Sequence, residues 1–103
     1  PSYGCNAGLV RLPLEITNGK VLLFSAPDNP GSTRRRMTVW ASFDCAKTWP
    51  VKRLVHEGPS GYSSLAAGSD GNIYLLFERG KKSEYETLSV ARFNLQWLTE
   101  VQD

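Results

Sequence analysis

The sequence lacks the features that mark several large classes of protein. Its 103 residues contain no apolar run close to the roughly 20 residues of a membrane-spanning helix, so we expect no membrane segment. There is one histidine, and the two cysteines, Cys5 and Cys45, stand at no metal-ligand or redox spacing, which argues against a metal site. The formal net charge is only +2, and no aromatic and basic residues form a stacking motif, so nucleic acid is not expected as a partner.

What the sequence does contain is a succession of short apolar, β-branched and aromatic segments. They predict seven strands, at residues 6–12, 20–26, 37–43, 51–57, 62–67, 72–78 and 87–95. Turn signals separate these segments, among them Asn-Gly at 18–19, Gly-Pro at 58–59 and Asp-Gly at 70–71. No segment keeps a 3.6-residue apolar stripe long enough for a convincing helix. The sequence therefore predicts an all-β fold.

The two halves of the chain repeat each other at a spacing of about 50 to 56 residues. The segment GKVLLF at 19–24 recurs as GNIYLLF at 71–77, and both are apolar on both faces. A four-stranded unit that repeats near this period is typical of a β-propeller blade, whose second strand is covered on both sides. We interpret residues 1–103 as one partial propeller, with a four-stranded first blade at 6–57 and an incomplete, three-stranded second blade at 62–95. The strand at 87–95 would then be an open edge that favours pairing with another chain.

Residues 42–49, SFDCAKTW, match the Asp-box pattern Ser-x-Asp-x-Gly-x-Thr-Trp, with alanine in place of the glycine. Such a turn is structural. Ser42 begins the pattern, the carboxylate of Asp44 can accept backbone N–H bonds across the turn, Thr48 can add a hydroxyl bond, and Trp49 can pack the turn onto the blade. Ala46 adds a Cβ where a positive φ is often used, so we expect some strain there.

Two further segments flank this turn. Residues 60–65 read SGYSSL and place Tyr62 among small residues at the start of a strand. Arg34 lies 28 residues earlier, in the run STRRRMT at 32–38. In this order and at these spacings, the chain from residue 5 to residue 98 resembles the C-terminal part of an exo-α-sialidase (neuraminidase). The resemblance implies two blades of a six-bladed propeller, in a retaining glycosidase that acts on sialylated glycans without a metal or cofactor. It also implies a secreted, periplasmic or lysosomal location.

The resemblance assigns roles to individual residues. Tyr62 matches the family's catalytic nucleophile, and Arg34 matches an arginine that binds the carboxylate of sialic acid. Arg35 and Arg36 stay open as alternatives to Arg34, because a slip of one or two residues changes the match. Glu78 matches a glutamate that orients another arginine of the site.

Asn6 occupies the repeat position equivalent to Tyr62 and should face the same central funnel. There it would contact substrate or make structural hydrogen bonds.

Four elements of the family have no match here, because in the family they lie upstream of this region. They are the first and second arginines, the aspartate that acts as acid and base, and the glutamate paired with the tyrosine. We therefore expect the isolated chain to be inactive, with the missing N-terminal part of the propeller, or self-association through the edge at 87–95, completing it. The alternative is a non-catalytic Asp-box propeller fragment or sugar-binding module.

Overall fold

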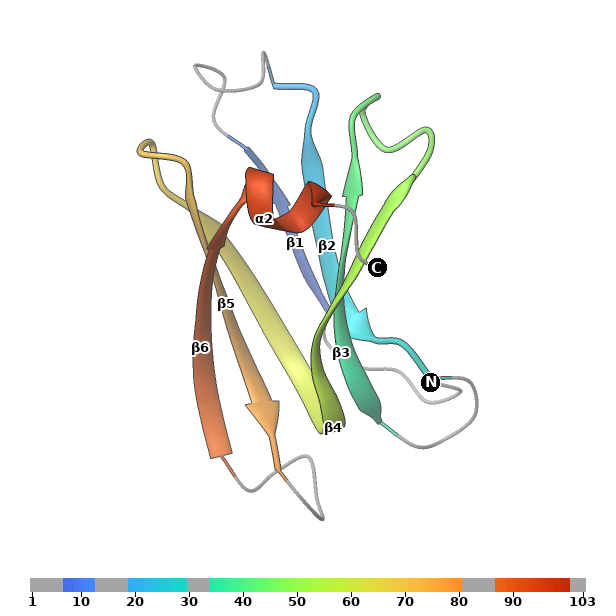
Figure 1. Ribbon diagram of the computed structural model, residues 1–103, viewed down its shortest axis with the longest axis vertical. Coiled ribbons are helices and arrows are strands. Elements are labelled where there is room, and N and C mark those ends of the chain that lie inside the picture. The colour runs from blue at the N-terminus through green and yellow to red at the C-terminus, as the bar shows by residue number, and fades with distance from the viewer. Residues whose placement is uncertain (1–6, 13–18, 30–33, 81–86, 101–103) are drawn as a thin grey trace.

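The computed structural model describes residues 7–12, 19–29, 34–80 and 87–100, which form six antiparallel strands and one short helix (Figure 1). Each strand pairs with the next along the chain, and their bounds are β1 (Gly8–Arg11), β2 (Leu22–Pro27), β3 (Arg35–Ser42), β4 (Val51–Ala67), β5 (Asn72–Arg79) and β6 (Thr87–Asn94). The helix α2 (Leu95–Thr99) has five residues, and no helix in the described part of the chain is long and apolar enough to cross a membrane. The predicted all-β class is confirmed.

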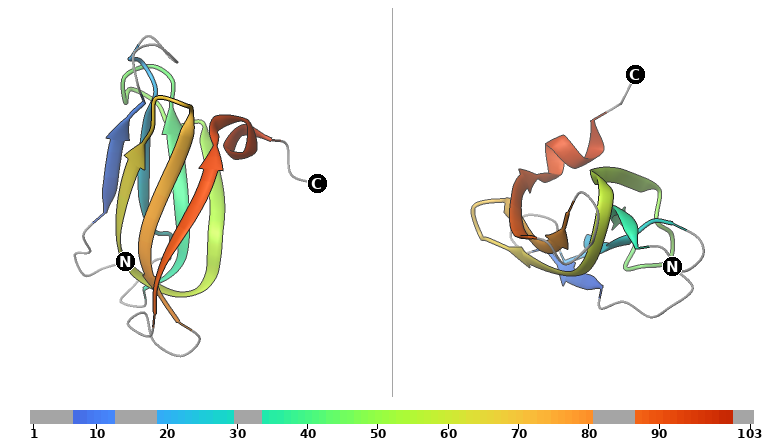
Figure 2. Two further views of the ribbon diagram at one scale, coloured as in Figure 1. Left: turned by 90° about the vertical axis from the view of Figure 1, so that its left-hand side faces the viewer. Right: turned by 90° about the horizontal axis from the view of Figure 1, so that it is seen from below.

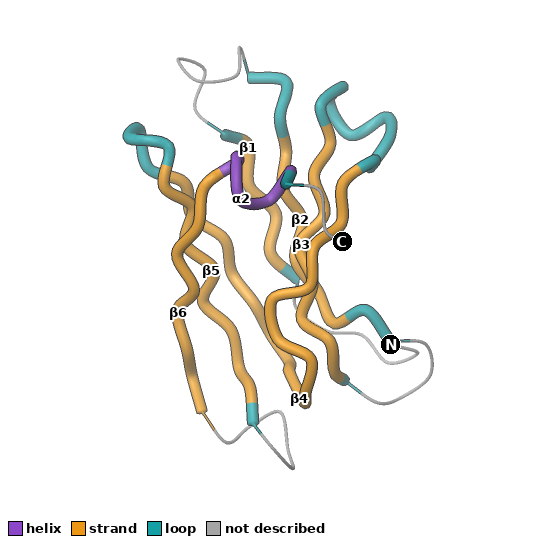
Figure 3. The backbone as a smooth tube through the Cα atoms, viewed as in Figure 1, coloured by secondary structure: helices purple, strands orange, loops and turns teal. Residues whose placement is uncertain are grey.

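The strand β4 belongs to two layers. Its first half pairs with β3, between Val51 and Pro59, and its second half pairs with β5, between Ser60 and Ala67. Figure 3 shows that β4 bends sharply between the two halves. The strands predicted at 51–57 and 62–67 are these halves, and the bend falls at the predicted Gly-Pro turn. The sheet is thereby divided into a four-stranded and a three-stranded layer, which curl around a common interior (Figure 2).

The interior is filled by residues that alternate along the strands. Leu23, Val39 and Leu75 are fully buried, and Ile73 is 1% exposed. Alternation follows from the strand's period of two, which sends successive side chains to opposite faces. Each such side chain contributes about 1.5 to 3 kcal/mol when it is removed from water. These residues come from both layers, so the core holds the two layers together.

The opposite face of the three-stranded layer is not covered within the described part of the chain. Leu76 on β5 is 40% exposed, and Leu88 and Val90 on β6 are 66% and 63% exposed. Leu76 and Val90 lie opposite each other in the β5–β6 register, so they form one apolar surface. The prediction that both faces of residues 71–77 are covered is therefore met on one face only.

The helix α2 was not predicted. The strand expected at 87–95 ends at Asn94, whose side chain accepts a hydrogen bond from the Trp97 amide at 2.8 Å and caps the helix. The guanidinium of Arg53 lies 3.8 Å from the centre of the Trp97 ring, and Leu98 is buried. A single capped turn is too short to produce a 3.6-residue pattern, and it is held by contacts with β4 that the sequence does not reveal.

The strand β1 and the second half of β4 approach each other closely at Gly8. Its amide donates to the hydroxyl of Ser25 at 3.2 Å, and the Ser25 and Ser63 hydroxyls lie 2.8 Å apart. A Cβ at position 8 would lie 2.4 Å from the Ser25 oxygen and 3.0 Å from the Leu65 amide nitrogen. Glycine is therefore required here by close packing of β1 against the second half of β4.

We predict that Gly8→Ala destabilises the chain by roughly 1 to 3 kcal/mol, because the new methyl group overpacks the junction between the layers. Urea unfolding of the wild type and the variant measures the change. Gly68→Ala is the matched control. Its Cβ would meet the exposed Asp70 carboxylate at 2.7 Å, and only two exposed hydrogen bonds from Asn72 hold that carboxylate, so we expect a smaller loss of stability. Equal losses in the two variants would contradict the packing argument.

Candidate functional site

The bend of β4 brings Arg34 and Tyr62 together. The central carbon of the Arg34 guanidinium lies 5.4 Å from the centre of the Tyr62 ring, within the range of a cation–π contact. The Ser60 amide donates to the Arg34 carbonyl at 3.0 Å, which ties the residue before β3 to the start of the second half of β4. Tyr62 is 45% exposed, so its ring lies at the surface rather than among core residues.

Glu78 joins these residues from β5. One of its carboxylate oxygens accepts a hydrogen bond from the Tyr62 amide at 2.9 Å. The pairing of β4 with β5 shifts here, since Ser60 lies opposite Arg79 and Ser63 lies opposite Phe77. Two residues of β4 thus lie opposite one residue of β5, which is a β-bulge. Glu78 satisfies an amide that the bulge removes from the regular ladder.

A shallow pocket of about 280 Å³ lies beside Tyr62. Its lining comes from β4, β5 and β6 and consists of Tyr62, Ser63, Ser64, Leu76, Glu78 and Leu88. A larger pocket of about 470 Å³ lies beside α2 and is lined in part by Phe93 and Trp97. The smaller pocket is the better candidate, because it holds a hydroxyl-bearing aromatic ring, a carboxylate and a neighbouring guanidinium.

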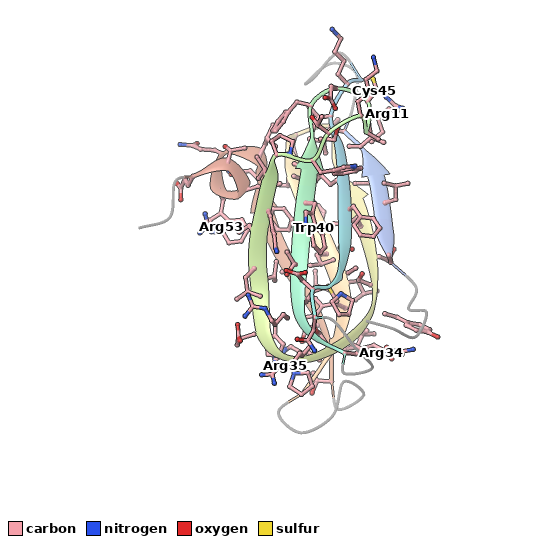
Figure 4. The ribbon with its side chains drawn as sticks, turned by 90° about the vertical axis from the view of Figure 1, so that its right-hand side faces the viewer. Arg11, Arg34, Arg35, Trp40, Cys45 and Arg53 are labelled. Atoms are coloured by element: carbon pink, nitrogen blue, oxygen red, sulfur yellow. The ribbon has the colours of Figure 1, made fainter. Side chains whose placement is uncertain are left out.

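The other arginines of the run lie elsewhere. Arg36 donates from Nη1 to both carboxylate oxygens of Glu57, at 2.9 and 2.7 Å, and so is engaged with the first half of β4. Arg35 is exposed, and Figure 4 shows that it points away from Arg34. Arg34 is therefore the member of the run that contacts Tyr62. Asn6 and Cys5 lie outside the described residues, whereas Cys45 is exposed and free.

The Asp-box turn is closed by its own polar side chains. Ser42 donates to Asp44 at 2.8 Å, and the Thr48 amide and hydroxyl donate to the Asp44 carboxylate at 2.8 and 2.6 Å. The Thr48 hydrogen bonds lower the pKa of Asp44 to about 2, because they favour the charged carboxylate. The Trp49 ring packs against Phe24, with centres 6.3 Å apart.

This turn is remote from the candidate site. Figure 4 shows Cys45, within the turn, at the opposite end of the strands from Arg34. Cys45 and Ala46 have φ values of 59° and 70°, so the strain expected at Ala46 corresponds to an observed left-handed conformation. The geometry favours a structural role for the turn.

No group of three or more His, Cys, Asp or Glu side chains that could hold a metal ion occurs in residues 7–12, 19–29, 34–80 and 87–100. Three predicted site residues come together at the bend of β4: Arg34 and Glu78 both contact Tyr62. Their chemical roles stay predictions. Sequence reasoning did not find the bulge at Tyr62, because a register shift depends on the partner strand.

Known proteins similar to this chain include several sialidases, although no family model matches it. It is 38% identical over 97 residues to a sialidase of Micromonospora viridifaciens. The aligned region covers 90% of this chain and 14% of that protein. It is 31% identical over 97 residues to Sialidase-3 of Mus musculus, covering 84% of this chain and 22% of that protein. The chain thus spans less than a quarter of the length of either curated relative.

Two solved structures with a similar fold are those of a sialidase and a trans-sialidase. The Hadza microbial sialidase Hz136 superposes with a TM-score of 0.74 and 33% identity, over 92% of this chain and 18% of that one. The intramolecular trans-sialidase from Ruminococcus gnavus, solved in complex with oseltamivir carboxylate, superposes with a TM-score of 0.71 and 25% identity. The superposition covers 98% of this chain and 24% of the trans-sialidase chain.

We predict that Ala46→Gly stabilises the chain by about 0.5 to 1 kcal/mol, because glycine adopts a positive φ without the steric penalty of a Cβ. Ala66→Gly is the control. Ala66 is an exposed residue of β4 whose φ is not positive. Glycine at this position should therefore destabilise the chain by a similar amount. Thermal or urea unfolding measures both. A loss of stability in both variants would contradict a strained conformation at position 46.

Proposed function

The chain is homologous to sialidases over most of its length, and from this premise we propose that it carries part of the active site of a retaining exo-α-sialidase. The observation that carries the proposal is the contact between the Arg34 guanidinium and the Tyr62 ring, 5.4 Å from its centre. It joins the two residue types that hydrolysis of a sialoside needs, a neutral nucleophile and a cation for the sugar's carboxylate.

The chemistry of the substrate explains why a tyrosine suits this role. Sialic acid carries its carboxylate on the anomeric carbon, so a carboxylate nucleophile would approach against charge repulsion. Glycosidases of this kind use tyrosine instead. In the proposed reaction the Tyr62 oxygen bonds to the anomeric carbon while the bond from that carbon to the leaving oxygen breaks. Water then releases sialic acid, with two inversions giving overall retention.

Each step also requires proton transfer. The phenol must lose its proton to a base, because a neutral hydroxyl is a weak nucleophile, and the leaving oxygen must receive a proton from an acid. Among the residues that line the pocket at Tyr62, Glu78 has the only carboxylate, and one of its oxygens already accepts the Tyr62 amide. We propose that the base and the acid come from other parts of the protein, so that the chain alone does not turn over sialosides.

The position of Arg34 supports its role as a carboxylate ligand. A guanidinium offers a planar fork of N–H donors that matches a carboxylate, and it stays charged at any working pH. The contact places the guanidinium of Arg34 over the Tyr62 ring, 5.4 Å from its centre. A sialic acid whose carboxylate met Arg34 would then bring its anomeric carbon near the phenol. One arginine gives modest affinity, and further cations elsewhere in the protein would complete the clamp.

We predict that Tyr62→Phe, made in the full-length gene product that contains this chain, lowers kcat on a fluorogenic sialoside by about a thousandfold or more, because the attacking oxygen is lost. Tyr74→Phe is the control. It removes the same oxygen from an exposed tyrosine on β5 and should leave kcat unchanged. Sialoside binding without turnover in the wild type would favour the sugar-binding module instead. Undiminished turnover in Tyr62→Phe would reject the nucleophile.

A further inference from the structure

Arg36 has an unusual backbone conformation for its place in the fold. Its φ is 64°, and it lies within β3. The other non-glycine residues with positive φ in the described part of the chain, Cys45 and Ala46, lie in the Asp-box turn, where such values are common. A long side chain with positive φ inside a strand is rare, and such outliers occur most often beside functional sites.

Several interactions hold Arg36 in this conformation. Its carbonyl accepts hydrogen bonds from the Asp28 amide at 2.9 Å and from the Thr38 hydroxyl at 2.7 Å. The Thr38 side chain is buried, so its hydroxyl is held in place. The guanidinium of Arg36 pairs with Glu57, but both side chains are exposed, and exposed pairs contribute little. The two bonds to the carbonyl, together with the pairing of Arg35 and Met37 with β4, therefore restrain the backbone.

The left-handed residue changes the face to which earlier side chains point. Met37, Val39 and Ala41 alternate along β3 and are fully buried against the interior that the second layer closes. In a regular strand the same alternation would send Arg35 toward the second layer and Arg34 away from it. The structure shows the opposite. Arg35 is exposed, and Arg34 lies over Tyr62, which belongs to the second layer.

Figure 4 shows Arg34 and Arg35 pointing in opposite directions at the start of β3. The break in alternation falls between them and Met37, where Arg36 has its positive φ and where the pairing of β3 with β4 also shifts register. The Arg34 carbonyl is fixed on the other side of this break by the Ser60 amide, at 3.0 Å. Two restrained points thus flank the turn of the backbone, and beside them the Arg34 side chain lies over Tyr62.

We propose that Arg36 is a positioning residue: its left-handed backbone directs Arg34 onto Tyr62 and so sets how the site binds the substrate's carboxylate. The inference rests on the proposed function for its substrate, but its geometric content concerns this chain alone. The conformation is what matters here, and the charge of Arg36 is not required. Glycine or asparagine at position 36 should therefore preserve the effect, whereas a β-branched residue, for which a positive φ is strongly unfavourable, should abolish it.

The test compares Arg36→Val with Arg36→Gly and Glu57→Gln in the full-length gene product. We expect Arg36→Val to raise KM for a sialoside about tenfold or more while kcat stays within about threefold, because ground-state binding through a guanidinium–carboxylate pair is lost. Arg36→Gly and Glu57→Gln should stay within about threefold of wild type in both constants. An Arg36→Gly variant as impaired as Arg36→Val would overturn the inference, as would an Arg36→Val variant with unchanged KM.

A spectroscopic readout separates this inference from the proposed function. In this chain, the Tyr62 ring current should shift the NMR signals of the Arg34 side-chain protons upfield. The shift should be lost in Arg36→Val and kept in Arg36→Gly, whether or not the full-length protein acts on sialosides. If the full-length protein turns over no sialoside, the proposed function fails and the ring-current shift alone decides the inference; a shift that persists in Arg36→Val overturns it.

A second pair of variants applies if Arg36→Val does not fold. Thr38→Val removes the hydroxyl that donates to the Arg36 carbonyl, and Thr38→Ser keeps it. We expect Thr38→Val to weaken the Arg34 ring-current shift and Thr38→Ser to restore it. Equal shifts in the two Thr38 variants would also overturn the inference.

Discussion

The arrangement of this chain depends on the change of pairing partner within β4. The strand pairs with β3 up to Pro59 and with β5 from Ser60 onward, and the Ser60 amide bonds to the Arg34 carbonyl at this point. Because the strand bends there, residues 28 positions apart in sequence become neighbours at the surface. The same bend folds the three-stranded layer over the four-stranded one, so the core and the candidate site share one structural cause.

Irregular backbone concentrates around this bend. Arg36 has a positive φ, β4 contains register shifts on both sides of Pro59, and a carboxylate of β5 takes the place of a ladder acceptor at Tyr62. In a regular strand, alternation would have turned the Arg34 side chain away from the second layer. The Asp-box turn at the opposite end is also left-handed, but its hydrogen bonds are confined to its own residues, and nothing in it faces a pocket that contains Tyr62.

Much of the fold could be predicted from the sequence, because the signals are local. Short apolar, β-branched and aromatic segments predicted each strand to within a few positions, and Gly-Pro at 58–59 marked the bend. The match of Tyr62 and Arg34 to a family motif identified two residues that the structure then places in contact.

What could not be predicted depends on partners distant in sequence. The helix α2 is held by Arg53, the bulge at Tyr62 is set by β5, and an arginine at position 36 carries no local signal for a positive φ. Asn6 lies outside the described residues, so its role stays a prediction.

The most direct test of the central claim is to trap the bond that the account requires. The full-length gene product would be incubated with a fluorinated sialosyl donor, whose fluorine slows breakdown of a glycosyl–enzyme intermediate, and the peptides would be mapped by mass spectrometry. The account predicts a sialosyl adduct on the peptide that contains Tyr62, attached to the tyrosine oxygen. An adduct on a carboxylate, or efficient turnover of sialosides with Tyr62 never modified, would contradict it.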